Sequence, residues 1–319
     1  MSEIKLFRTT LILLCAILLK GCLAERAYCP LFRNVTVRFV YIYNGGDVFS
    51  ANVQMVNLFV FDNETGLLVH NEEVNYYKLN EFAGTMLSHL EPGEYHLVGW
   101  GNVLERNIFS GVDEGEHFTG AFVGRRGVPR STEPQSGDGD RLHFAPGSLI
   151  IPRWSSDDIE ITLPFTRAYI GLEVFVIDKF LYSGELESPV IEIDGAATHF
   201  DFERVPEGNI TLRENTVVQT QFVERPAVAM FRVKLFDNIS AIKQLRVHSG
   251  VDHEVHFSID QTEFRQMITQ FMVENGIFSL KSDPTPRRVI PILIRFTGQD
   301  VEVSIEVPNF EPVPGTPIY

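Results

Sequence analysis

The sequence predicts an all-β protein built from antiparallel β-sandwiches, and three observations support this class. Apolar residues alternate with polar ones, as Val35, Val37 and Phe39 do with Thr36 and Arg38; a period of two is typical of a strand that is buried on one side. Clusters of turn residues separate the apolar runs. Helical patterns do not alternate with the strands, which disfavours a parallel α/β sheet. We therefore expect many short strands in stacked sheets.

Ten apolar runs have the length and alternation expected of strands. They are residues 35–43, 56–62, 93–100, 159–163, 170–177, 190–193, 228–236, 255–259, 290–296 and 301–307. One helix is expected after Asp260, because Glu263 completes the spacing of a capping box. The apolar residues of this helix recur at helical spacing, at Phe264, Met267, Ile268 and Phe271. We interpret this stripe as core packing rather than a cofactor site.

The length of 319 residues predicts two domains, because a domain usually takes about 100 to 200 residues. We place the boundary at residues 164–167, between an N-terminal sandwich (residues 22–165) and a C-terminal sandwich (residues 166–319). Residues 125–141 are rich in Gly, Pro, Ser and charge, and we expect them to form an exposed loop of the first domain.

Residues 1–21 have the layout of an export signal. Lys5 and Arg8 precede the apolar run 11–19, which has the length of a signal-peptide core and is short for a bilayer span. Gly21 directly precedes Cys22, with Leu19 two places earlier; lipoprotein signal peptidase favours this pattern, although Lys20 departs from it. We expect lipidation of Cys22, which would suffice for stable membrane anchoring. The alternative is ordinary secretion with cleavage after Ala24.

Composition and motifs exclude several classes of function. The formal charge of −15 repels phosphate backbones, so no nucleic-acid partner is expected. The three cysteines, Cys15, Cys22 and Cys29, lie near the amino terminus, so the folded body has no cysteine that could form a disulfide. The sequence contains no serine-hydrolase elbow, zinc-protease helix or phosphate-binding loop. We therefore expect no enzyme activity, no catalytic residue, no metal and no cofactor.

Two weak metal patterns have simpler explanations. His253 and His256 lie three residues apart, and on the expected strand their side chains point to opposite faces. Asp138 and Asp140 flank Gly139 but lack the further ligands of a calcium loop. We interpret the first pattern as a solvated pair and the second as a hydrophilic turn.

Three segments in roughly the first third of the chain carry a family resemblance. Cys22 is followed by Cys29 before Pro30, and a strand pattern begins at Val35. Residues 56–62 end in Phe-Asp, and residues 90–102 contain a Gly-x-Tyr strand that leads into Trp-Gly-Asn. Together these segments resemble the Bacteroidales fimbrial anchor lipoproteins, which accompany the major and minor fimbrillins.

The resemblance implies a fold, a role, a location and a partner. The fold would be two tandem transthyretin-like Greek-key sandwiches. The protein would be a fimbrial anchor subunit, attached to the outer membrane through lipid on Cys22 and exposed at the cell surface, and it would end fimbrial assembly at the base. Its partner would be a fimbrillin, joined by strand exchange.

The candidate donor strand lies near the carboxyl terminus. Its alternating apolar residues are followed by prolines that hold the tail extended; the apolar residues are Val301, Val303, Ile305 and Val307, and the prolines are Pro308, Pro312, Pro314 and Pro317. The alternative is that the strand pairs within the chain's own sheet.

Two other functions stay open from the sequence. One is a surface glycan-binding lipoprotein or fimbrial-tip adhesin, for which Tyr76, Tyr77 and Trp154 are candidate contacts, although core or rim packing explains these rings more simply. The other is a secreted hydrolase whose site is assembled from separated strands.

Overall fold

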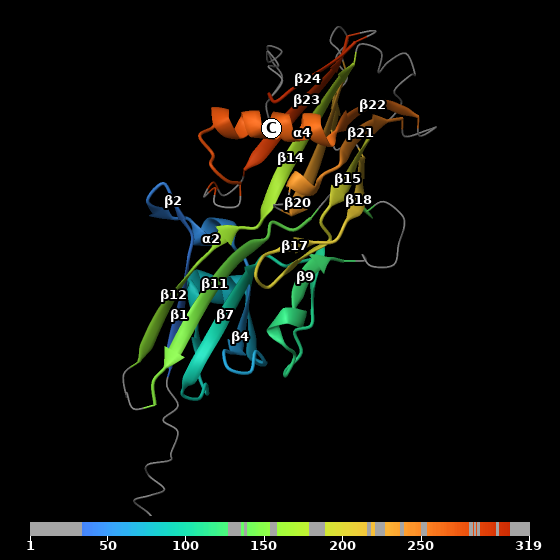
Figure 1. Cartoon of the computed structure of the whole chain (residues 1–319). Helices are drawn as coiled ribbons and strands as arrows, with labels where there is room; N and C mark the ends of the chain where they lie inside the picture. Colours follow the sequence, from blue (N-terminus) through green and yellow to red (C-terminus); the bar gives the residue numbers. More distant parts are fainter. Residues whose placement is uncertain are drawn as a thin grey trace, which may run out of the picture.

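The computed structural model describes residues 34–126, 135–136, 139–153, 158–178, 189–215, 218–220, 227–236, 239–249, 254–280, 283, 285, 288–297 and 300–306. They form an elongated molecule with one sandwich toward each end (Figure 1). Several residues discussed above lie outside the described residues: Cys22, Cys29, Asp138, Trp154, His253 and Val307, together with the tail to Tyr319.

The first sandwich packs a three-stranded sheet against a five-stranded one. The three-stranded sheet has the order β12-β1-β6, and its strands are β1 (Val35–Val40), β6 (Gly84–Leu87) and β12 (Ile159–Pro164). The other has the order β13-β11-β7-β4-β5, and its strands are β4 (Val56–Asp62), β5 (Leu68–Val74), β7 (Gly93–Gly101), β11 (His143–Ile151) and β13 (Thr166–Arg167). Apolar side chains of both sheets, among them Phe39, Leu58 and Leu97, form the core between them.

Short elements complete the first sandwich. They are the hairpin of β2 (Ile42–Tyr43) and β3 (Gly46–Asp47) and the helices α2 (Phe49–Asn52) and α3 (Tyr76–Glu81). Helices α2 and α3 are not predicted from the sequence, because four and six residues are too few to establish a helical period.

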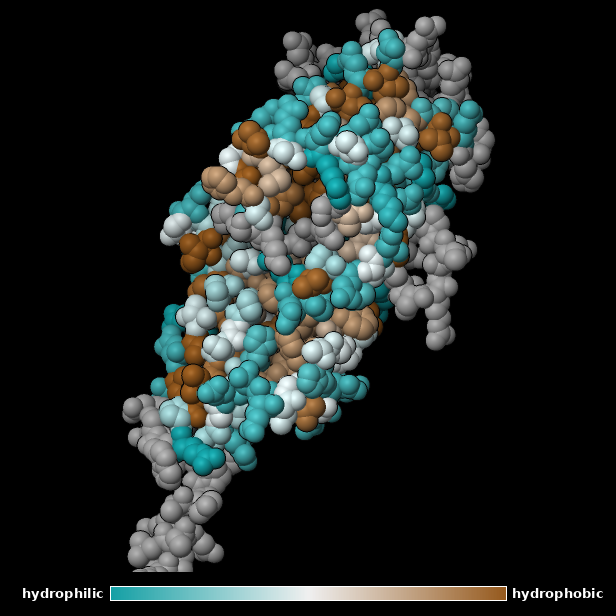
Figure 2. Space-filling model, in the orientation of Figure 1, coloured by the Kyte–Doolittle hydropathy of each residue, from teal (hydrophilic) through white to brown (hydrophobic). Residues whose placement is uncertain are grey.

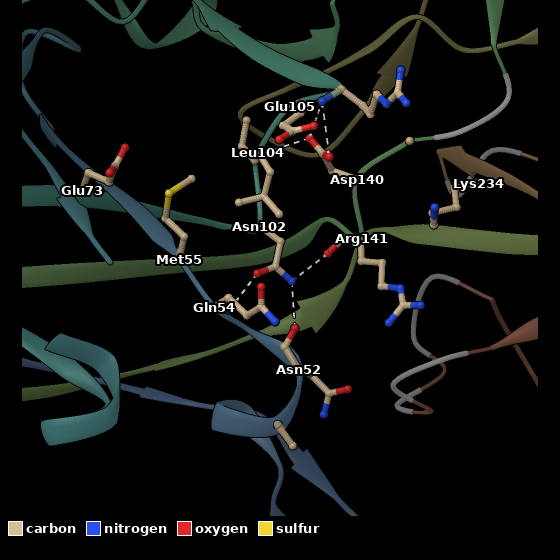
Figure 3. A pocket seen from close by; sticks show the side chains of 14 residues that line it. Asn52, Gln54, Met55, Glu73, Asn102, Leu104, Glu105, Asp140, Arg141 and Lys234 are labelled. Atoms are coloured by element: carbon tan, nitrogen blue, oxygen red, sulfur yellow. Dashed lines mark hydrogen bonds between the residues drawn. The ribbon is translucent and has the colours of Figure 1, made fainter. Parts of the chain in front are cut away.

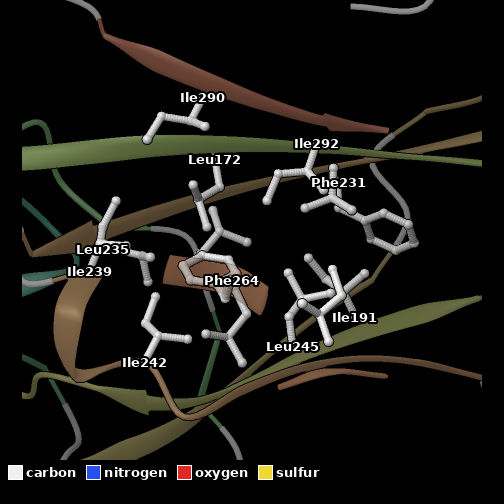
Figure 4. Close-up of a cluster of buried hydrophobic side chains, with 14 of the residues drawn as sticks. Leu172, Ile191, Phe231, Leu235, Ile239, Ile242, Leu245, Phe264, Ile290 and Ile292 are labelled. Atoms are coloured by element: carbon white, nitrogen blue, oxygen red, sulfur yellow. The ribbon is translucent and has the colours of Figure 1, made fainter. Parts of the chain in front are cut away.

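The second sandwich packs two five-stranded sheets over a core of aliphatic and aromatic side chains (Figure 4). The first sheet has the order β10-β18-β15-β21-β22, with β10 (Gln135–Ser136), β15 (Val190–Ala196), β18 (Ile210–Asn215), β21 (Gln244–His248) and β22 (Val255–Asp260). The second has the order β19-β20-β14-β23-β24, with β14 (Tyr169–Asp178), β19 (Val218–Thr220), β20 (Ala227–Phe236), β23 (Val289–Phe296) and β24 (Val301–Ser304). A short 3₁₀ turn, η2 (Ile239–Ala241), follows β20.

The predicted helix is confirmed as α4 (Gln261–Glu274). Asp260 accepts hydrogen bonds from the backbone N–H groups of Thr262 and Glu263, and the Glu263 side chain completes the capping box. Its buried residues, Phe264, Ile268 and Phe271, belong to the core of the second sandwich. The stripe therefore packs, as expected.

A small sheet joins segments from both sides of the expected domain boundary. Its order is β17-β16-β9-β8, with β8 (Asn107–Ser110), β9 (Phe122–Arg125), β16 (His199–Asp201) and β17 (Pro206–Glu207). It covers a third apolar core that contains Trp100, Phe144 and Phe202. The turn η1 (Phe118–Gly120) precedes β9. Figure 2 shows that, on the side drawn in Figure 1, hydrophilic residues separate small groups of hydrophobic ones.

The prediction of an exposed loop at residues 125–141 is wrong for several of its described residues. Arg125 ends β9, is only 7% exposed, and donates a side-chain hydrogen bond to the carbonyl of Lys234 in β20. Gln135 and Ser136 pair with β18 of the second sandwich. Arg125 and the strand at residues 135–136 therefore contact the second sandwich.

The ten expected strands each overlap an observed strand, but their pairing is not purely antiparallel. β1 runs parallel to β12, and β14 runs parallel to β23. Alternation identifies a buried face but contains no information about the direction of the neighbouring strand. The parallel pairs join segments far apart in the sequence, which local patterns do not reveal.

Candidate assembly interface

The first described strand is an integral part of the first sandwich. β1 lies in the middle of its sheet, with β12 on one side and β6 on the other. Val35, Val37 and Phe39 are fully buried. Gly84 of β6 lets the strands approach, since a Cβ there would lie 2.3 Å from the carbonyl oxygen of Val37. Removing β1 would therefore open a gap through the middle of the sheet.

Unlike β1, the candidate donor strand lies on the edge of its sheet. β24 pairs antiparallel with β23, so that Val303 lies opposite Ile294 and Val301 opposite Phe296. Val301, Val303 and Ile305 are half-buried against the second core. Residues 301–304 thus pair within the chain's own sheet, and the strand ends before Ile305 instead of reaching residue 307. No described strand pairs with the outer edge of β24.

A buried ion pair connects the two sandwiches. The Arg167 guanidinium, on β13, lies 3.2 Å from the Asp283 carboxylate and donates to the carbonyl of Thr285 at 2.8 Å. Both side chains of the ion pair are almost completely buried. Arg288 also binds Asp283, at 2.7 Å. Burial alone would raise the pKa of Asp283, but hydrogen bonds from Arg288 and Thr285 outweigh it and lower this pKa to about 2. Asp283 is therefore charged at neutral pH.

Asn102, the last residue of the Trp-Gly-Asn motif, joins three loops. Its Oδ1 accepts a hydrogen bond from the backbone N–H of Gln54 at 2.8 Å. Its Nδ2 donates to the carbonyls of Asn52 at 2.8 Å and Arg141 at 3.1 Å (Figure 3). Asn102 is 5% exposed and has a φ of 59°, a backbone conformation that Asn tolerates better than most residues.

The rest of this motif also has a packing role. Trp100 is fully buried, with its ring 4.8 Å from that of Phe144. A Cβ on Gly99 would lie 2.8 Å from the Phe165 ring, and a Cβ on Gly101 would lie 2.9 Å from Val53. The motif therefore fixes where β7 ends and where the next loops begin.

The Asn102 loops border a polar cavity of about 750 Å³ between the sandwiches (Figure 3). Asp140, in its wall, accepts hydrogen bonds from the backbone N–H groups of Leu104 and Asn107, both at 2.9 Å, and of Arg106 at 3.2 Å. From the sequence, Asp140 is interpreted as part of a hydrophilic turn. Its carboxylate has a structural role as well, because it holds the backbone of the loop after β7 in place.

The remaining candidate residues have mixed outcomes. Among the described ranges, no group of three His, Cys, Asp or Glu side chains could hold a metal. Within the same ranges, no helix has the length and apolarity needed to cross a membrane. The packing interpretation is wrong for Tyr77, which is 79% exposed, beside Tyr76 at 50%. The centroids of the two rings lie 6.1 Å apart.

The sequence patterns do not reveal the roles of Asn102, Arg167 and Asp283. For Asn102 a signal exists, because an Asn after a Gly at the end of a strand is typical of a positive φ. For Arg167 and Asp283 no local signal exists, since they lie 116 positions apart in the sequence.

Comparison with known proteins decides the family. The sequence matches the family model described as "Fimbrillin-A associated anchor proteins Mfa1 and Mfa2" over residues 26–311. The chain belongs to this family. A search of curated protein sequences finds no match.

Solved structures have the same fold as this anchor-family protein. The fimbrial anchor protein Mfa2 from Porphyromonas gingivalis aligns with a TM-score of 0.62 at 14% identity, over 86% of this chain and 95% of that one. A candidate adhesin from Bacteroides ovatus aligns with a TM-score of 0.63 at 12% identity, over 86% and 92%. A candidate polysaccharide-binding protein from Bacteroides thetaiotaomicron aligns with a TM-score of 0.64 at 15% identity, over 83% of this chain and 91% of that one. Membership of the anchor family gives this protein a fimbria-associated role at the cell surface.

Asn102→Ala tests the role of the turn after β7. The variant loses the side-chain hydrogen bonds to Gln54, Asn52 and Arg141 in a buried site, so we expect the free energy of unfolding to fall by about 3 kcal/mol. Asn44→Ala is the matched control, because Asn44 is exposed and has a φ of 50°; it should cost about 1 kcal/mol. Urea unfolding measures both, and equal losses would assign the effect to the backbone alone.

His143 should make stability depend on pH. Burial lowers the pKa of this 1% exposed ring from 6.5 to about 4, although the Arg141 carbonyl opposes the shift. The unfolded chain therefore takes up a proton at a higher pH than the folded one. We expect the free energy of unfolding to be unaffected by this group above pH 6.5 and to fall by about 3 kcal/mol as the pH drops to 4.

Urea unfolding at a series of pH values measures this slope. His143→Gln should flatten it between pH 6.5 and 4, whereas His117→Gln, on the surface, should leave it unchanged. An unchanged slope in His143→Gln would assign the acid sensitivity to other groups.

Proposed function

We propose that this protein is the base subunit of a fimbria, held in the outer membrane by lipid on Cys22, and that it ends fimbrial assembly there. The position of β1 is the observation that carries this proposal. Assembly by strand exchange requires a vacant place in a sheet for the incoming strand. In the first sandwich β1 fills the centre of its sheet, so no strand can enter there and the polymer cannot extend on this side.

The lipid tether lies close to this strand in the sequence. Eleven residues separate Cys22 from Asn34, and a chain of this length spans at most about 40 Å. A membrane attached through Cys22 would therefore lie near the start of β1. Several acyl chains on one residue contribute enough buried methylene groups for stable anchoring.

The opposite end of the molecule supplies the candidate contact with the fimbrillin. β24 is an edge strand with half-buried apolar residues, whereas the inward side chains of β1 are fully buried. Detaching β24 would therefore remove less apolar surface from the core than detaching β1. We infer that the strand containing Val301, Val303, Ile305 and Val307, with the tail behind it, is donated to the next subunit.

Glycan binding is a second candidate function, and one observation favours it. Tyr76 and Tyr77 form an exposed ring pair on α3, and exposed aromatic faces are typical of surfaces that bind a partner. The phenotype of a deletion strain separates the two functions. Loss of an anchor releases long fimbriae into the medium, whereas loss of an adhesin leaves attached fimbriae that bind poorly.

Cys22→Ser tests the anchor itself. This variant should lose metabolic labelling with a radioactive fatty acid, and fimbriae should move from the cell fraction to the culture medium, because nothing then holds the base. Cys29→Ser, seven residues further along, is the matched control and should retain both. Attached fimbriae on cells carrying the unlabelled Cys22→Ser protein would contradict the proposal.

Deletion of residues 308–319 tests donation of the carboxyl-terminal strand. The deletion leaves the pairing of β24 with β23 intact, so the free energy of unfolding should not change. We expect loss of the complex with fimbrillin in detergent-solubilised outer membranes, with the fimbriae again in the medium. An unchanged yield of attached fimbriae would exclude residues 308–319 as part of the donor.

A further inference from the structure

A second cavity, of about 460 Å³, lies where the small sheet meets the five-stranded sheet of the first sandwich. It is separate from both candidate assembly strands. Residues from both halves of the chain line it, and the apolar ones are Phe61, Phe118, Phe144, Pro146 and Phe202; the others are Asp62, Asn63, Gly66, His96, His117 and Glu203. A cavity with an apolar wall and a few polar groups is the usual form of a small-ligand site.

Aromatic rings form the wall of this cavity, which we call the aromatic pocket. The Phe118 ring packs edge-on at 5.2 Å from Phe61 and at 4.8 Å from His96. The Phe202 ring packs edge-on at 5.9 Å from Phe61. Phe61 and Phe202 are 1% exposed, whereas Phe118 is half-buried. The rings hold one another in place, so the wall is formed before any ligand arrives.

The polar groups of the aromatic pocket carry negative charge. Asp62 and Glu203 are the carboxylates of its lining, which contains no Lys or Arg among the described residues. Hydrogen bonds from the backbone N–H and hydroxyl of Thr65 lower the pKa of Asp62, and both go to Oδ1. Burial lowers the pKa of His96, and the charge of Glu203 acts in the opposite direction. The carboxylates are therefore not neutralised by a cationic neighbour in the lining.

His117 closes one side of the aromatic pocket. Its ring lies over Gly66, where a Cβ would be 2.3 Å from Nε2, and its Nδ1 lies 2.9 Å from the Thr119 hydroxyl. The Gly66 N–H donates to the Asp62 carbonyl, and the Phe118 N–H donates to the Gly66 carbonyl, at 2.8 and 2.9 Å. The turn after β4 and η1 are thus fixed to each other.

We propose that the aromatic pocket binds an organic ammonium group carried on an apolar stem. Aromatic faces attract cations through their quadrupole, most strongly when the cation has lost its water, and the carboxylates of Asp62 and Glu203 add a direct attraction. The stem occupies the apolar wall, as the methylene groups of a lysine do. An anionic ligand meets like charges here. A neutral ligand of the same shape gains only the apolar contacts.

Calorimetric titration of the mature protein in detergent tests this inference with charged and neutral ligands of equal shape. Choline chloride is compared with 3,3-dimethyl-1-butanol, its neutral carbon isostere. Nα-acetyl-lysine methylamide is compared with the norleucine compound, which lacks the amine. These two arms distinguish a quaternary headgroup from a lysine side chain as the source of the ammonium group. We expect saturable binding of at least one cation, about tenfold tighter than that of its neutral partner.

Two variants locate the site. Glu203→Gln should weaken binding of the cation by about tenfold and leave the neutral ligand unchanged. Phe118→Leu should weaken the cation more than the neutral ligand, because the side chain stays apolar but loses its quadrupole. The matched controls are Glu81→Gln and Tyr77→Leu, at exposed positions outside this pocket.

Unfolding midpoints of all four variants should match that of the parent protein, which checks that the fold is intact. Equal affinities for choline and its neutral isostere and for the lysine and norleucine compounds, absence of binding at millimolar concentration, or unchanged binding in Glu203→Gln would each overturn the proposal.

Discussion

The burial of β1 is the interaction on which the first sandwich depends. Val35, Val37 and Phe39 are fully buried, and each contributes about 1.5–3 kcal/mol when removed from water. The same strand supplies backbone partners to β12 and β6, which would otherwise be two unpaired edges. The first described strand is therefore fixed in the body of the protein, and this position is consistent with the proposed tether at Cys22.

The joint between the sandwiches is specified by polar contacts. Arg167 and Asp283 are almost completely buried, so breaking the pair would leave an uncompensated charge in a dry site. Arg204 adds a hydrogen bond from its guanidinium to the Arg167 carbonyl, at 2.6 Å. The small sheet adds backbone pairing across the same joint. Together these contacts connect the two ends that would carry the membrane and the fimbria.

The strands and the candidate site differ in how far the sequence predicts them. β4 and α4 are predicted accurately because their apolar patterns are long and regular. β5 is missed because its middle is polar, and β11 is missed because Pro146 and Gly147 interrupt it. Pro146 cannot donate a backbone hydrogen bond to a neighbouring strand. It is tolerated because, among the described strands, only β7 pairs with it; β13 pairs only with residues 143 and 144. The aromatic pocket has no local signal, as its residues come from five stretches of the chain, at residues 61–66, 96, 117–118, 144–146 and 202–203.

The sequence by itself determined the all-β class and the family, because these depend on local alternation and short motifs. The lipidation of Cys22 stays a prediction from the sequence. Only the tertiary structure decided which strands are central and which lie on an edge, where Arg125 and Arg167 are buried, and which aromatic rings meet in a pocket. The reason is physical. A period of two identifies the buried side of a strand, but it does not identify the strand's neighbours. For β1 with β12 and β14 with β23, the neighbour comes from a segment more than a hundred positions away.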